Sequence, residues 1–210
     1  MPSPVRLTLP VVAVFASVTA AAQDPRIDRV PAESRAAVVA LIDSARGAGL
    51  PVEPLMQRAL EGTTKHASGE RIVAAVRHLA GDLGRARDAL GAPASPAELN
   101  AGAMALRAGA SSETLAELRR ARRDALIVPL AVLTDLMASG VPADSAAAAV
   151  LALAATTRDA DLVAFRQAVE RDIALGAAPG PAAAAAASSF SAAPQASGAH
   201  GQQGAQPRKP

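Results

Sequence analysis

Apolar side chains recur every three or four positions through most of the chain, which is the period of an α-helix. A first stripe predicts a helix over residues 33–46. In a second stripe the spacing between apolar residues alternates between four and three positions, which predicts a longer helix that packs on a neighbouring helix. A third marks the last amphipathic helix. The three stripes are Val38, Leu41, Ile42 and Ala45; Ile72, Val76, Leu79, Leu83, Ala86 and Leu90; and Leu162, Phe165, Val169 and Ile173.

Three short stretches between the stripes share the order glycine, apolar residue, proline or serine, any residue, acid. Glycine adopts the left-handed conformation that ends a helix, and the apolar residue after it packs back on the last turn. Proline or serine suits the start of a new helix, where an acid faces the positive end of the helix dipole. The pattern predicts helix-to-helix corners at Gly49 and Pro51, at Gly109 and Ser111, and at Gly140 and Pro142.

The similarity extends beyond the corners and indicates a repeat of about 40 residues. One copy runs over 49–91 and another over 140–176, with a partial copy around Gly109 between them. Such periods are typical of stacked helical hairpins. We therefore predict an all-α protein of stacked antiparallel hairpins, a short α-solenoid-like bundle. Chance resemblance between alanine-rich helices is the alternative.

Proline and glycine positions add local predictions. The run from Ser95 to Glu98 has the form of a capping box and predicts a helix that ends at Ala108. Pro129 forbids an unbroken helix across its neighbourhood and predicts a kink or a tight break. Gly81 and Gly84 lie inside a predicted helix, which we attribute to close approach of a partner helix.

Composition agrees with helices and divides the chain into four parts. Alanine is abundant, and there are only 3 phenylalanines and no tryptophan, tyrosine or cysteine. Residues 1–22 resemble a signal peptide, with an uncleaved anchor as the alternative, and 23–32 form a lead-in. Residues 33–176 form the helical-hairpin repeat domain. The tail over 177–210 lacks acids and large apolar residues apart from Phe190, so we expect it to be disordered.

Candidate chemistry is sparse. Without cysteine or tyrosine, the titratable groups of interest are His66 and His78, each with an acid four residues on, Glu70 and Asp82. Two such pairs do not make a zinc site, which needs converging ligands. No nucleophile elbow or phosphate-binding loop is present. We predict no enzyme activity, no cofactor and no metal. The scarcity of aromatic side chains also argues against carbohydrate and single-stranded nucleic-acid partners.

One dense charge cluster remains, at Arg119, Arg120, Arg122 and Arg123. It indicates either contact with an anionic surface such as lipid phosphates, or a solvated face paired with Glu113, Glu117 and Asp124. Residues 24–176 hold 18 basic and 19 acidic side chains, a net charge of −1, which gives no general support for binding polyanions.

The leading hypothesis is a periplasmic or secreted interaction module for an unidentified protein partner, with no transmembrane span once the signal peptide is cleaved. An envelope-surface or anionic-lipid-associating protein is the alternative, and an enzyme comes third.

Overall fold

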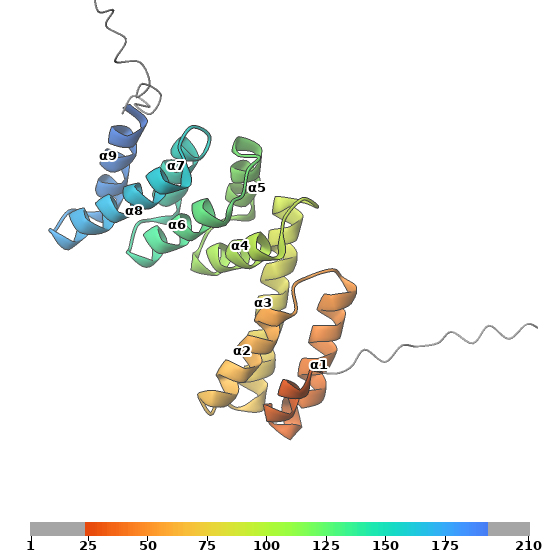
Figure 1. Cartoon of the computed structure of the whole chain (residues 1–210). Helices are drawn as coiled ribbons and strands as arrows, with labels where there is room; N and C mark the ends of the chain where they lie inside the picture. Colours follow the sequence, from red (N-terminus) through yellow and green to blue (C-terminus); the bar gives the residue numbers. More distant parts are fainter. Residues whose placement is uncertain (1–23, 193–210) are drawn as a thin grey trace, which may run out of the picture.

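The computed structural model describes residues 24–192, and in this range every regular element is a helix (Figure 1). The prediction of an all-α chain is confirmed. The elements are the short 3-10 helix η1 (Pro25–Arg29) and the α-helices α1 (Ala32–Gly47), α2 (Glu53–Thr64), α3 (Gly69–Leu90), α4 (Pro96–Ala108), α5 (Ser112–Ala121), α6 (Ile127–Ala138), α7 (Ala143–Ala154), α8 (Asp159–Ala174) and α9 (Pro179–Ala192).

All three predicted corners have the expected backbone. Gly49, Gly109 and Gly140 have φ values of 69°, 116° and 87°. At each corner the residue after the glycine donates its N–H to a carbonyl five residues back, at 2.9 to 3.0 Å, so the last turn of the helix is closed. Ser111 accepts a hydrogen bond from the Thr114 N–H at 3.0 Å and caps α5. Pro142 directly precedes α7.

Two further corners of the same kind lack the sequence pattern. Gly176, at φ 100°, joins α8 to α9, and no acid follows it. His66, at φ 52°, joins α2 to α3 and takes the place that glycine has elsewhere. The left-handed conformation is costly for a residue with a Cβ, so His66 is a strained position.

Helix α3 is the longest element and belongs to two groups of helices (Figure 1). Its first turns pack on α1 and α2, and its last turns pack on α4 and α5. All six positions of the predicted stripe from Ile72 to Leu90 are buried. Gly81 and Gly84, by contrast, have no neighbouring atom within 4 Å of where a Cβ would stand. The predicted close approach of a partner helix at these glycines is therefore wrong.

The local predictions around α4 and α6 agree with the structure. Ser95 and Glu98 form the capping box, and α4 ends at Ala108. Pro129 lies in the first turn of α6, where its missing N–H is not needed for the helix. The predicted break in the helix therefore exists, and it is the non-helical stretch from Arg122 to Leu126 just before α6.

From α3 onward the helices form two layers, as in an α-solenoid. Helices α3, α5, α7 and α9 pack in one layer, and α4, α6 and α8 pack in the other. The two predicted repeat copies are not equivalent, however. Helix α2 packs along α3, whereas α7 makes few contacts with α8 and packs on α9 instead. The recurring feature is a helix of one layer, a positive-φ glycine and a helix of the other layer.

Part of the predicted disordered tail is a helix. In α9 the buried side chains are Ala182, Ala183, Ala186 and Ala187, which face α7 and α8. Phe190 meets Phe165 of α8 edge to face, with ring centroids 6.0 Å apart. The prediction counted only the apolar area of the segment itself and missed that small side chains let its backbone approach bulky neighbours. The folded domain thus extends past 176 to 192. The predicted signal peptide and the tail beyond 192 lie outside the described residues.

Candidate functional site

Arg119 of the arginine cluster is part of the packing between α4 and α5. Its Nη2 lies 2.5 Å from Glu98 Oε1, and the two side chains are only 19% and 7% exposed. Nη1 donates weaker hydrogen bonds, at 3.4 Å, to the carbonyl oxygens of Arg123 and Asp124. The guanidinium group therefore fixes the loop after α5 to the start of α4.

Glu98 is the carboxylate on which three segments converge. It accepts hydrogen bonds from the Ser95 N–H at 2.8 Å, the Ser95 hydroxyl at 3.0 Å and the Leu126 N–H at 2.9 Å. Burial by itself raises the pKa of Glu98, but these hydrogen bonds and the one from Arg119 outweigh burial and lower the pKa from 4.5 to about 2. Glu98 is thus a charged structural junction between α4, α5 and the start of α6.

Arg122 also points inward. Its Nη2 lies 2.6 Å from Asp159 Oδ1, and its side chain is 12% exposed. A longer hydrogen bond, at 3.4 Å, runs from Nη1 to the Thr157 carbonyl oxygen. This residue therefore joins the end of α5 to the first residue of α8 and to the loop just before it.

The other two arginines face solvent. Arg120 is 70% exposed and lies 3.7 Å from Glu117. Arg123 is exposed and forms no ion pair with any described residue. Glu113 and Asp124, the other two expected carboxylate partners, form no ion pair with the cluster. The structure therefore divides the four arginines into two packing residues and two surface residues rather than one basic face.

Neither histidine pair is brought together. His66 is exposed at the corner between α2 and α3, and no hydrogen bond joins it to Glu70. His78 is exposed as well, while Asp82 accepts a hydrogen bond from Arg85 at 2.7 Å. Within residues 24–192, no three histidine, aspartate or glutamate side chains gather where they could hold a metal ion.

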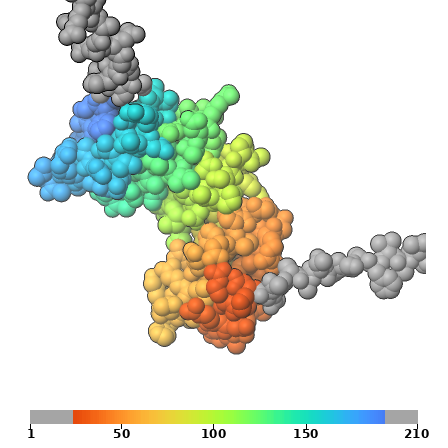
Figure 2. Space-filling model, viewed as in Figure 1, coloured from red at the N-terminus to blue at the C-terminus, as the bar shows by residue number. Residues whose placement is uncertain are grey.

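The C-terminal end of the stack presents an uncharged surface that sequence reasoning missed. Leu175 is 81% exposed at the corner between α8 and α9, which projects from the body of the molecule (Figure 2). The hydroxyls of Ser188 and Ser189 donate to carbonyl oxygens of their own helix at 3.0 Å, so they add little polarity to the surface. We call the following exposed residues the terminal surface: Ala174, Leu175, Gly176, Ala177, Ala178, Pro181, Ala184, Ala185, Ser188 and Ser189.

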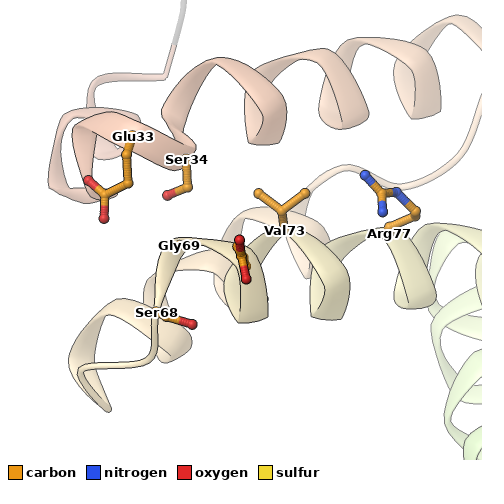
Figure 3. A pocket seen from close by; sticks show the side chains of 7 residues that line it. Glu33, Ser34, Ser68, Gly69, Val73 and Arg77 are labelled. Atoms are coloured by element: carbon orange, nitrogen blue, oxygen red, sulfur yellow. The ribbon is translucent and has the colours of Figure 1, made fainter.

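An open cleft of about 520 Å³ lies at the opposite end, between the first turns of α1 and α3. Glu33 and Ser34 face it from α1, and Val73 and Arg77 face it from α3 (Figure 3). The two helices touch at Gly69, where a Cβ would stand 3.1 Å from the side chains of both Glu33 and Ser34. The sequence gives no sign of this cleft, because its two walls are more than 30 residues apart in the chain.

No helix between residues 24 and 192 combines the length and apolar character that crossing a membrane requires. Comparison of the chain with protein-family models, with curated proteins and with solved structures finds no match.

Proposed function

We propose that this protein is an exported, non-enzymatic interaction module whose helix stack binds a protein partner through the terminal surface. The observation that carries the proposal is the combination of a highly exposed Leu175 with an outer face of α9 that has no charged side chain. Solenoid proteins generally end on a capping element with a polar outer face, which keeps the last repeat soluble. The outer face of α9, the last helix of the described residues, has no charged side chain.

Helix packing chemistry supports a protein rather than a small polar molecule as the occupant. Alanine and serine side chains allow the backbone of another helix to approach closely, and Leu175 provides a larger apolar contact beside them. Exposed apolar patches of this kind are typical of protein–protein contact sites. Such a partner would add one more helix to the stack, next to α9.

Site-specific photocrosslinking in the native host tests this proposal. A photoreactive amino acid placed at Leu175 or at Ala185 is expected to give adducts with the same partner protein. The matched control is Ala40, an exposed alanine on α1 at the other end of the molecule. Adducts at Ala40 as abundant as those at the two terminal positions would refute a specific terminal surface.

Export is part of the proposal and has its own test. The Ala20-Ala21-Ala22 run follows the apolar segment of the predicted signal peptide, so we expect a mature chain that begins at or near Gln23. N-terminal sequencing of protein from the periplasm or the medium measures this directly. Recovery only of protein that begins at Met1, and only from membranes, would contradict it.

The alternative role at an anionic surface has weaker support, because Arg119 and Arg122 are occupied by Glu98 and Asp159. Within the arginine cluster, Arg120 and Arg123 face solvent and could meet lipid phosphates, although Arg120 lies 3.7 Å from Glu117. Charge-driven binding falls steeply with ionic strength. Binding to anionic vesicles that is strong at low salt, and that is lost in an Arg120→Gln/Arg123→Gln variant, would favour this role over the first.

A further inference from the structure

We propose that the cleft between α1 and α3 binds a short extended peptide segment that carries a cationic and an anionic side chain about three residues apart. The site lies at the opposite end of the molecule from the terminal surface, and it is independent of the function proposed above. Its geometry rests on Gly69, which brings the first turns of the two helices into contact and leaves an open cleft beside them.

The charges in the cleft have no partners on the protein. Glu33, Glu70 and Arg77 form no ion pair or hydrogen bond with any other described residue, although most charged side chains between residues 24 and 192 do. On α1 and α3 the positions three and four residues away from each of them hold alanine, valine or glycine. Elsewhere the chain uses these spacings for ion pairs, as in Asp43 with Arg46.

The first turn of α3, which borders the cleft, has no side-chain cap. Ser68 occupies the N-cap position of α3, but its side chain makes no capping hydrogen bond. Ser95 and Ser111 occupy the N-cap positions of α4 and α5, and their side chains do accept capping hydrogen bonds. The first N–H groups of α3 therefore have no side-chain acceptor. Peptide carbonyl oxygens are acceptors of the kind that these N–H groups bind.

The arrangement selects a ligand with two opposite charges. Glu33 and Glu70 come from the first turns of two helices and attract a cation, while Arg77 lies two turns further along α3 and attracts a carboxylate. Seven residues of helix span about 10 Å, and an extended peptide covers that distance in about three residues. Val73, partly buried between the two ends, provides an apolar floor for the peptide between its charges.

Nuclear magnetic resonance titration of the full chain with the capped peptide acetyl-Lys-Ala-Ala-Asp-amide tests the proposal. We expect saturable shifts of the amide signals between residues 68 and 77. The analogues with two lysines or with two aspartates are expected to bind at least fivefold more weakly. Absence of saturable shifts, or equal binding of the two-lysine analogue, would overturn the proposal. Magnesium chloride that reproduced the shifts by itself would also overturn it, in favour of a simple cation site.

Two variants with matched controls localise the binding. We expect the Glu33→Gln/Glu70→Gln variant to bind the Lys-Ala-Ala-Asp peptide at least tenfold more weakly than the unmodified chain does. The control variant Glu113→Gln/Asp124→Asn removes two other unpaired exposed acids, and its affinity for the peptide is expected to stay within twofold of that of the unmodified chain. The Arg77→Gln variant is likewise expected to lose affinity for the peptide, and Arg123→Gln is its control. All of these residues are exposed, and circular dichroism checks that each variant folds. Equal losses in a variant and its control would show that binding reflects net charge alone.

Discussion

The two ends of the molecule bury their cores by different means. At the N-terminal end, α2 and α3 pack large aliphatic side chains such as Leu55 and Ile72, and Gly62 lets the helices come close. At the C-terminal end, α9 buries alanines against α7 and α8, and Phe190 is its only large apolar side chain. A helix with almost no bulk of its own can therefore be ordered when its neighbours provide the bulk.

The largest expected effect tests this dependence at the C-terminal end. Phe165 is fully buried in α8 and touches α9 through Phe190. We expect Phe165→Ala to lower the free energy of unfolding by about 3–5 kcal/mol, through lost transfer energy and a cavity. Phe190→Ala, at a half-buried position, is expected to cost clearly less. Denaturant unfolding measures both, and equal costs would mean that α9 carries as much of the core as α8.

The next effect concerns Glu98, at the junction between the two ends. Glu98→Gln leaves the nearly buried Arg119 without its carboxylate, and we expect a loss of about 3 kcal/mol at neutral pH. Because the folded state lowers the pKa of Glu98 from 4.5 to about 2, the unfolded chain binds the proton more readily in this window. The stabilisation is thus complete above pH 4.5 and is lost as the pH falls towards 2. A stability difference between the two proteins that did not shrink over this range would contradict the assignment.

A glycine in the N-terminal packing gives an intermediate effect. A Cβ at Gly62 would stand 2.8 Å from Ile72 Cγ1, within the branched part of that side chain. Overpacking of this kind outweighs the better helix propensity of alanine, so we expect Gly62→Ala to destabilise the protein by about 1–2 kcal/mol. A neutral or stabilising result in thermal unfolding would show that α2 and α3 have room to adjust.

The corners give a smaller effect that is shared by both ends. Gly49→Ala and Gly140→Ala place a Cβ on a backbone with positive φ, and we expect each to cost about 1 kcal/mol. Gly47 is a close control, because it ends α1 without positive φ and has no neighbour within 4 Å. If Gly47→Ala lowered the free energy of unfolding as much as Gly49→Ala and Gly140→Ala do, the left-handed conformation would not be the cause of the loss.

The smallest effect has the opposite sign and lies in the middle of α3. Gly81 and Gly84 have open space around the Cβ position, so an alanine adds helix propensity without a clash. We expect each Gly→Ala change to stabilise the protein by about 0.5–1 kcal/mol. Denaturant unfolding measures the change, and a lower free energy of unfolding in either variant would indicate that this stretch of α3 needs its glycines.

Features encoded within one helix or one corner could be predicted from the sequence. The stripe of α3, the capping box at Ser95 and the three glycine corners depend on residues a few positions apart. The Arg119–Glu98 pair joins positions 21 residues apart, and nothing in the local pattern distinguishes this arginine from Arg120. The same limit applies to Gly62 and Gly81, since only the packed structure shows which glycine meets a neighbour.

The two missed surfaces also have physical reasons. The cleft needs α1 and α3 side by side, and the sequence does not state that these helices touch at Gly69. The terminal surface exists because α9 is a folded helix, and alanine-rich sequence by itself does not decide between order and disorder. In both places the deciding energy comes from neighbours that are distant in the chain.

The shared helix α3 has a consequence for how the molecule loses its structure. The first turns of α3 pack on Gly62 of α2 and on the start of α1, and its last turns pack on α4 and α5. The end of α1 also reaches the C-terminal part of α3, where Arg87 donates a hydrogen bond to the Ala48 carbonyl oxygen. Opening either group of helices removes part of the packing of α3, and a short helix segment is marginal in water when it stands alone. Melting that starts at one end of the molecule therefore weakens the support of the other end, and we expect α3 to couple the unfolding of the two groups of helices.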